Sequence, residues 1–582
     1  MWIAGIGAAS VLLLGAAVVT LGLWGSRGGI AAFLRGQRDP AVELRADAPV
    51  REPVEGEGPA AVSVRVEIDT DAPVHRVSAE YLSVAIDSSQ VTGGRWWDPE
   101  ARGVETGTGT VESPVFDFDR PRLDALVEPL SPMWLRIGGS EADKIYYDLD
   151  NPARASEQPP PGFESVLTRG QWDALNAFAG RNGLRVIFTL NAGPSVRDGR
   201  RGPWSPDNAR ELIRYTAQRG YPVELWELGN EVNNFWYVFG PRRQVSARRY
   251  AADARAAIRL IDAEHPGAAF AGQGGMIWPV LGEPLGLFFG ISHRAVGLIG
   301  SDLAVVSWHY YPQQGRRGPI ASRSAHPARL LNPDNLDEAA YWGARFRRSR
   351  DRHAPDAELW VGETGNAQFG GEPGLSDVYL GGLWWLDQLG LLARNGHDVV
   401  VRQSLSGQDY GLLEAGSLEP RPDYWNSLAW KELMGREVFE ARSTAREGTS
   451  AEAAEKVRVY AHGAGPGYAR SPSPADAADA ADAADAGRRA VTLLAINLHH
   501  DRAARLAVPQ LDPGTGRRYQ FDATDIFARV VRLNDTPLGL GPDGAPPRLS
   551  DMGRAPTGAD LVLPPLTYAF VVGRAGQGDG DG

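Results

Sequence analysis

Residues 223–231 read "VELWELGNE", a short run of β-branched and aromatic residues that ends in polar ones, and it predicts a strand. Seven further runs of this kind occur, at 80–87, 133–139, 184–193, 268–274, 304–311, 358–365 and 399–405. Helical patterns such as "QWDALNAFAGRNG" (171–183) and "SARRYAADARAAIRLIDAEH" (246–265) fill several of the gaps. Eight strands alternating with helices over roughly 330 residues predict a (β/α)8 barrel. An open doubly wound sheet is the alternative, but no Gly-rich phosphate loop follows the first strand.

The pattern changes after about residue 436, where strands and turns follow one another with little helix. We expect an appended antiparallel β-sandwich over 436–575, built from runs such as "KVRVYAHG", "AVTLLAINLHH", "RRYQFDAT", "ARVVRLN" and "TYAFVVG". The early run "VSVRVEID" predicts that residues 62–75 add a strand to this sandwich, which leaves 76–435 for the barrel. Low-complexity composition predicts a surface loop at 471–489 and a flexible tail at 576–582.

The first 61 residues divide into two parts. Residues Trp2 to Ser26 carry no charge and are strongly apolar, which predicts a transmembrane anchor or signal segment over 1–26. Residues 27–61 are rich in Pro, Gly, Glu and Arg and predict a flexible linker. The three arginines after the apolar run would keep that side cytoplasmic, but large domains can translocate regardless. We therefore expect an extracytoplasmic, membrane-anchored catalytic domain, or a secreted one if the segment is cleaved.

Composition excludes several classes of function. The net charge of −12 argues against nucleic acid as a partner. The absence of cysteine excludes disulfides, thiolate metal sites and cysteine nucleophiles.

Two carboxylates are expected at the carboxyl ends of barrel strands, where catalytic groups gather in this fold. Glu231 ends the fourth predicted strand, and Glu363 lies near the end of the seventh. A lone Glu at such a place often only solvates a loop. Two of them match the pair that glycosidic cleavage needs, one protonated to assist the leaving oxygen and one ionised. Glu224 and Glu227 lie in the same strand as Glu231 and are interpreted as structural.

The motifs "WELGNEVNNF" (226–235) and "LWVGETGNAQFGG" (359–371) resemble heparanase and its relatives in glycoside hydrolase family 79. Further stretches at 75–89, 130–143, 375–405 and 421–435 are similar to the family, so the resemblance covers roughly residues 62–575. It implies that Glu231 is the acid/base, that Glu363 is the nucleophile of a retaining enzyme, and that Asn230 binds the sugar 2-hydroxyl. Tyr311 resembles the tyrosine that orients the nucleophile, with His309 nearby.

The resemblance also implies a site for a uronic acid, formed by the backbone amides of Gly370 and Gly371 and by the Tyr410 hydroxyl. Asp87, Gly139 and Ser140 match positions on the sugar-binding side. No metal and no cofactor are implied. The expected partner is an oligo- or polysaccharide that contains glucuronic acid.

Some features depart from the family. The loop "TGNAQFGG" carries an extra residue and has Phe369 in place of a common tyrosine, and the basic clusters that bind heparan sulfate in animal heparanase have no counterpart. For this reason the sequence is compatible with two activities, that of an exo-β-glucuronidase and that of a heparanase-like endo-β-glucuronidase. A catalytically inactive, membrane-anchored glycan-binding protein is the alternative from another class. A metal-dependent barrel enzyme would need several carboxylates or histidines at adjacent strand ends, and His309 alone does not supply them.

Overall fold

The computed structural model describes residues 61–103, 109–153, 158–197, 199, 202–283, 290–319, 321–470, 489–511, 516–555 and 560–575. The predicted anchor 1–26, the linker up to residue 60, the stretch 471–488 and the tail 576–582 lie outside these residues. Within the described part, no helix combines the length and the apolarity needed to cross a membrane.

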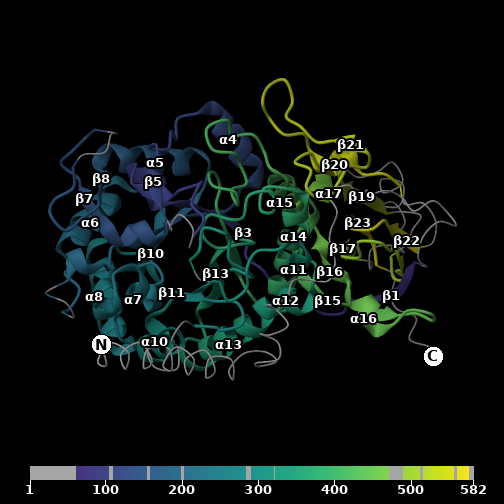
Figure 1. Cartoon of the computed structure of the whole chain (residues 1–582), viewed down its shortest axis with the longest axis horizontal. Helices are drawn as coiled ribbons and strands as arrows, with labels where there is room; N and C mark the ends of the chain where they lie inside the picture. The colour runs from purple at the N-terminus through teal and green to yellow at the C-terminus, as the bar shows by residue number, and fades with distance from the viewer. Residues whose placement is uncertain are drawn as a thin grey trace, which may run out of the picture.

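Eight parallel strands close into a barrel in the left half of Figure 1. They form because each is a short apolar run buried on both faces, by the barrel interior and by the surrounding helices. In chain order the strands are β3 (Leu82–Asp87), β6 (Trp134–Gly138), β9 (Arg185–Leu190), β10 (Val223–Leu228), β11 (Ala269–Ile277), β12 (Val305–Tyr310), β13 (Glu358–Thr364) and β14 (Val399–Gln403).

Helices cover the outside of the barrel, and their apolar faces pack onto the strands. The main ones are α4 (Pro121–Val127), α5 (Arg169–Arg181), α6 (Asp207–Arg219), α8 (Ala247–Glu264), α10 (Ser292–Ile299), α13 (Glu338–His353), α14 (Tyr379–Arg394) and α15 (Pro422–Leu433). Side chains cap the amino ends of several of these helices. Thr168 and Gln171 form a capping box at the start of α5, and Ser246 caps α8.

The barrel interior changes from apolar to polar along the strands. Near their amino ends the enclosed residues form an apolar cluster in which the Trp134 and Trp360 rings lie 5.2 Å apart. Two residues further along, where the side chains face the same way again, Leu225 is followed by Glu227 and Val305 by Ser307. Residues Trp134 and Arg136 are related in the same way. Because side chains on a strand alternate with a period of two, a polar layer follows the apolar cluster inside the barrel. This polar layer lies beneath the open end of the barrel, where the carboxyl ends of the strands meet.

A second unit of mainly antiparallel strands lies beside the barrel, in the right half of Figure 1. Its strands are β1 (Val62–Asp69), β2 (His75–Arg76), β15 (Met434–Ala445), β16 (Val457–Ala464), β17 (Ala490–Asn497), β18 (Ala504–Ala507), β19 (Arg517–Asp522), β20 (Arg532–Leu533), β21 (Thr536–Pro537), β22 (Asp560–Leu563) and β23 (Tyr568–Arg574). The predicted strand "ARVVRLN" is shorter than expected, since only Arg532–Leu533 are extended and paired.

The strand β1 precedes the barrel in the sequence but pairs with strands of this second unit. It runs antiparallel to β15, from Val64 opposite Ala445 to Asp69 opposite Glu440, and parallel to β18. Its alternate residues enter a core that also contains Phe439 from β15. The predicted fold class, a (β/α)8 barrel with an appended antiparallel β-sandwich, is confirmed, with the β1–β18 pair as a parallel exception.

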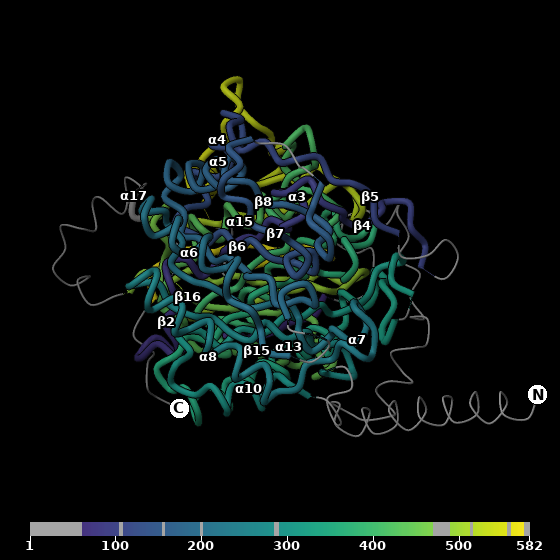
Figure 2. The backbone as a smooth tube through the Cα atoms, turned by 90° about the vertical axis from the view of Figure 1, so that its left-hand side faces the viewer, coloured from purple at the N-terminus to yellow at the C-terminus, as the bar shows by residue number. Residues whose placement is uncertain are grey.

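Helices α14 and α15 lie between the two units in Figure 1, and Figure 2 turns the barrel side of the molecule towards the viewer. All residues of α14 except Arg394 are buried. Tyr379, at its start, donates hydrogen bonds to the carbonyl oxygens of Phe521 and Leu566 in the sandwich. From the barrel side, the Tyr81 hydroxyl donates to the Leu389 carbonyl. The barrel and the sandwich therefore share one continuous core.

Candidate active site

Glu231 is presented by a turn that follows β10. Gly229 and Glu231 both adopt left-handed backbone conformations, with φ of 74° and 49°. A Cβ atom on Gly229 would lie 2.6 Å from a Val232 methyl group, so the turn requires glycine there. The amide of Asn230 donates to Asp143 Oδ2 at 2.9 Å, and the amide of Glu231 donates to the Gly274 carbonyl at 3.2 Å. A non-glycine residue in this conformation costs about 1–3 kcal/mol, and such strain clusters at functional sites.

Glu363 reaches the barrel interior through an irregularity in β13. The pairing of β13 shifts register on both sides, between Trp308 and His309 of β12 and between Val361 and Thr364 of β13 itself. Without this shift, strict alternation from the enclosed Trp360 would turn Glu363 towards the helices. A bulge of this kind re-aims a side chain, and here it turns the Glu363 carboxylate inward.

Both oxygens of Glu363 are held by hydrogen bonds. The Tyr311 hydroxyl donates to Oε1 at 2.7 Å, and Arg136 Nη1 donates to Oε2 at 2.9 Å. Burial and the Glu363 charge raise the pKa of Tyr311, so that its hydroxyl keeps the proton that it donates. The structure thus brings together Tyr311 and Glu363, the pair expected from the sequence.

Arg136 is the central cation of the site, and the sequence patterns did not identify it. In addition to Glu363, its guanidinium bonds Glu227 Oε2 and Asn230 Oδ1, each at 2.9 Å. Burial disfavours its charge, but the carboxylates of Glu227 and Glu363 outweigh this effect and raise the pKa of Arg136. The signal was present in "MWLRIGG", where an arginine interrupts an apolar strand two residues after an enclosed tryptophan.

The two neighbouring glutamates of β10 occupy different places. Glu227 is buried and also accepts a hydrogen bond from Thr189 at 2.8 Å. Glu224 points outward, where it pairs with Arg185. Glu227 therefore supports Arg136 from below.

His309 lies beneath Glu231 and is fully buried. Its Nδ1 atom is 3.1 Å from Glu231 Oε1 and 3.8 Å from Glu363 Oε2. Burial and the Arg136 charge lower the pKa of His309 well below its ordinary value, so the ring is neutral. Burial raises the pKa of Glu231 well above its ordinary value, and the charge of Glu363 adds to this, whereas Arg136 opposes it.

The same three residues also form the one group of potential metal ligands found in the described part of the chain. One ligand atom from each of Glu231, His309 and Glu363 lies within 4.8 Å of the others. The positive charge of Arg136 already lies next to the Glu363 carboxylate, and its repulsion disfavours a metal cation between these three residues.

A cavity of about 450 Å³ opens above these residues at the mouth of the barrel. Of the residues predicted from the sequence, it is lined by Asp87, Gly139, Ser140, Asn230, Glu231, Tyr311, Glu363 and Tyr410. Gly370 and Gly371 are not among the lining residues, and His309 lies below the floor. Gln368 and Phe369, which precede the glycine pair, form that part of the wall.

Asp87 and Gly139 fit together on one side of the cavity. Asp87 caps the short helix α3 (Ser88–Thr92) by accepting hydrogen bonds from the Ser89 amide at 3.0 Å and hydroxyl at 2.7 Å. A Cβ atom on Gly139 would lie 2.1 Å from Asp87 Oδ2, so only glycine leaves room for the carboxylate. Burial raises the pKa of Asp87 to about 7, although the bonds from Ser89 oppose this.

The remaining lining residues were not predicted from the sequence. They include four aromatic residues and a small set of charged groups: Trp96, Trp97, Tyr237, Phe369, Arg95, Glu141 and Lys144. Lys144 is paired with Glu141 at 2.8 Å and with Glu164 at 3.1 Å. The mouth therefore combines aromatic surfaces with hydrogen-bonding groups, a lining suited to sugar rings.

The sequence is similar to a family of known proteins. The family model described as "Glycosyl hydrolase family 79, N-terminal domain" matches residues 63–390. "Heparanase-like protein 1" of Arabidopsis thaliana is 30% identical over 398 residues, which cover 66% of this chain and 65% of that protein. "Heparanase" of Gallus gallus is 28% identical over 554 residues, which cover 88% of this chain and 95% of that protein.

Among solved structures, the α-L-arabinofuranosidase of Thermotoga maritima has a TM-score of 0.58 and 14% identity, covering 88% of this chain and 100% of that one. At this identity the likeness concerns the fold. Because the family model spans more than half of the sequence, this chain belongs to glycosyl hydrolase family 79 and is a glycoside hydrolase.

Proposed function

We propose that this protein is a retaining β-glucuronidase, with Glu231 as acid/base and Glu363 as nucleophile. The observation that carries the proposal is their spacing: one oxygen of each lies within 4.8 Å of the other. Retaining glycosidases hold the two carboxyl groups about 5–5.5 Å apart, whereas inverting enzymes leave about 6.5–9.5 Å for a water molecule. The spacing supports the retaining geometry.

The different surroundings of the two carboxyl groups support their separate roles. Glu363 has its negative charge compensated by Arg136 and its orientation fixed by Tyr311. Glu231 is buried next to that carboxylate, and burial with the Glu363 charge raises its pKa, which favours the protonated form that an acid needs. Glutamates whose environments differ in this way divide the acid and nucleophile roles between them.

In the first step, Glu363 attacks the anomeric carbon while Glu231 gives its proton to the departing glycosidic oxygen. A glycosyl ester on Glu363 results. In the second step, Glu231, now ionised, takes a proton from water, which attacks the same carbon and releases Glu363. Asn230 lines the cavity next to Glu231, where its amide can bond the sugar 2-hydroxyl while its carbonyl oxygen is held by Arg136.

The preference for glucuronic acid rests on the family and on the named relatives, together with Tyr410 in the cavity wall. We propose a glucuronic acid residue in the innermost sugar position, in a glycosaminoglycan-like chain or another glucuronide. Mass spectrometry of the products from heparan sulfate, hyaluronan and an aryl β-glucuronide distinguishes the two modes of action. Monosaccharide alone indicates exo action, and longer fragments indicate endo action.

Proton NMR during hydrolysis of an aryl β-glucuronide tests the mechanism. We expect the β-anomer of glucuronic acid to appear first, with the α-anomer following by mutarotation. Initial release of the α-anomer would overturn the retaining mechanism. Binding of glucuronides without turnover would instead favour the alternative, a glycan-binding protein without catalytic activity.

We also propose, from the sequence of residues 1–26, that the enzyme is held at the membrane with its barrel outside the cytoplasm. Protease accessibility of the barrel in intact cells, compared with lysed cells, tests this placement. Protection in intact cells would contradict it.

A further inference from the structure

A buried arginine, Arg317, lies behind the wall of the cavity and does not line it. It belongs to the loop that follows β12, and its side chain is 1% exposed. Its Nη2 atom lies 2.8 Å from Oδ2 of Asp409, which belongs to the loop after β14. The Asp409 amide in turn donates to the Gly370 carbonyl at 2.9 Å.

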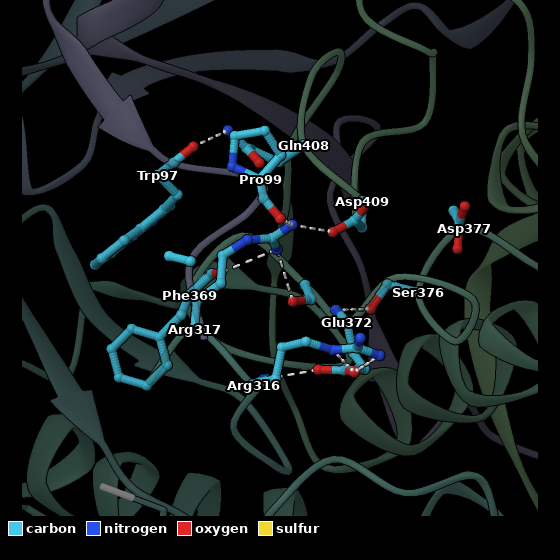
Figure 3. A network of polar contacts seen from close by, with 12 residues as sticks. Trp97, Pro99, Arg316, Arg317, Phe369, Glu372, Ser376, Asp377, Gln408 and Asp409 are labelled. Atoms are coloured by element: carbon cyan, nitrogen blue, oxygen red, sulfur yellow. Dashed lines mark hydrogen bonds and ion pairs between the residues drawn. The ribbon is translucent and has the colours of Figure 1, made fainter. Parts of the chain in front are cut away.

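The other donors of Arg317 go to backbone carbonyls of two further loops, as Figure 3 shows. Its Nε donates to Asp98 at 3.0 Å, and Nη2 donates to Pro99 at 3.2 Å. Its Nη1 donates to Gly371 at 3.2 Å and to Phe369 at 3.4 Å. One guanidinium therefore holds the segments 98–99, 369–371 and 409.

Each of these segments contains a residue of the cavity wall or lies directly next to one in the sequence. Trp97 precedes the first, Phe369 begins the second, and Tyr410 follows the third. The Trp97 and Phe369 rings pack edge to face with their centroids 5.4 Å apart. Gln408 strengthens the connection by donating from Nε2 to the Trp97 carbonyl at 2.8 Å.

Only an arginine can make this set of contacts. Its planar group offers five N–H donors in fixed directions, whereas a lysine offers three donors at one point. Removal of the guanidinium would leave several buried carbonyl oxygens and the Asp409 carboxylate without their partner, which favours rearrangement of the loops.

We propose that Arg317 is a positioning residue that sets the shape of the substrate-binding wall formed by Trp97, Phe369 and Tyr410. It does not contact the substrate. Because the wall is where a glucuronide would lie, this inference rests on the proposed function. Arg317 acts on substrate affinity and on the choice of uronide over neutral sugar, since neither Glu231 nor Glu363 is among its contacts.

The variants Arg317→Met and Arg317→Lys test this role, with Arg458→Met as the matched control. Arg458 is also a largely buried arginine, but it pairs with Asp337 and Asp387 away from the cavity. We expect both Arg317 variants to raise KM for an aryl β-glucuronide about tenfold or more, with kcat changed about threefold or less. The ratio of kcat/KM for the glucuronide over the matching glucoside should fall, whereas Arg458→Met should lower Tm and leave both constants unchanged.

Hydrogen exchange measured by mass spectrometry gives a readout that does not depend on activity. In Arg317→Met, peptides that cover 97–99, 369–372 and 408–410 should exchange faster, with no change in the sandwich strands β16 and β17. Unchanged exchange in those three segments, or KM values equal to those of Arg458→Met, would overturn the proposal. If the wild type hydrolyses no glucuronide but exchange changes as expected, the positioning role stands and the proposed substrate fails.

Discussion

Arg136 Nη1 lies 2.9 Å from Glu363 Oε2, while Nε of the same guanidinium lies 2.9 Å from Glu227 Oε2. One buried cation thus joins the strands β6, β10 and β13 beneath the cavity. The guanidinium pairs with two carboxylates, and its Nη2 atom also donates a hydrogen bond to the side-chain carbonyl oxygen of Asn230. The orientation of the nucleophile and the stability of the barrel are therefore coupled through this residue.

Replacement of Arg136 by methionine should reduce both activity and stability. Removal of one partner from a buried ion pair costs about 3–5 kcal/mol, because the remaining charges lose their compensation. Urea denaturation measures this loss. Arg214→Met, which removes a half-exposed pair with Glu264, is the control and should leave the urea midpoint nearly unchanged, because solvent screens this pair. Equal losses in the two variants would contradict the central role of Arg136.

Replacement of Tyr311 by phenylalanine should mainly lower kcat. The lost hydrogen bond to the charged Glu363 is worth about 1.5–3 kcal/mol, or roughly 10- to 150-fold in rate. Steady-state kinetics on an aryl β-glucuronide measures the effect. Tyr519→Phe, which loses a buried bond to the Ser550 carbonyl in the sandwich, should leave kcat unchanged. A wild-type kcat in Tyr311→Phe would exclude the orienting role.

The pH profile should report the raised pKa of Glu231. The first step requires its protonated form, so kcat/KM should fall as the pH rises through that pKa, well above the ordinary value for a glutamate. Glu231→Gln should remove this alkaline limb. The same variant should lose more activity on a methyl glucuronide than on a nitrophenyl glucuronide, whose leaving group needs no proton. An equal loss on both substrates would argue against Glu231 as the acid.

Stability should also depend on pH through Asp87. Its folded-state pKa of about 7 exceeds the ordinary value of 3.8, so the folded protein binds this proton more tightly than the unfolded chain. The contribution is complete below about pH 4 and is lost as the pH rises towards 7. Asp87→Asn keeps an oxygen for the Ser89 bonds and should remove this part of the dependence. Denaturation midpoints between pH 4 and 8 that fall equally in both proteins would contradict it.

Chelators should leave the activity unchanged. Although Glu231, His309 and Glu363 could together hold an ion, Arg136 already supplies the positive charge at Glu363. Dialysis against EDTA, followed by assay with and without added Zn²⁺ or Mn²⁺, tests this expectation. Loss of activity with EDTA and its return with one metal would identify a metal enzyme.

The sequence predicted the barrel well because its strands are short, apolar and regularly separated by amphipathic helices. Seven of the eight predicted runs contain the observed strand, and β11 extends three residues beyond the end of its run, to Ile277. The positions of Glu231 and Glu363 could be predicted because Glu231 follows the end of β10 closely and Glu363 lies near the end of β13. The inward direction of Glu363 could not, since it depends on a register shift in β13 that periodicity does not reveal.

Two buried arginines were also missed from the sequence alone, because their partners are distant along the chain. Arg136 and Arg317 have partners that lie 91 or more and 52 or more residues away, respectively. Local patterns do not reveal these partners, although the arginine within the apolar run "MWLRIGG" was a local signal for Arg136 itself. The family resemblance pointed to Gly370 and Gly371, but the wall of the cavity at this place is formed by Gln368 and Phe369. The longer loop noted in the sequence lies at this position.

The pairing of β1 with β15 has a consequence for biosynthesis and for dissection of the protein. Residues 62–69 leave the ribosome long before residues 434–445 are made, so β1 has no partner in β15 until all eight barrel strands have been synthesised. A truncation after the barrel would leave Val62, Val64 and Val66 uncovered and prone to aggregation. A cut before the sandwich would deprive that unit of a central strand. Neither half can therefore be expressed alone by a single cut, and a sandwich produced by itself needs β1 fused back to it.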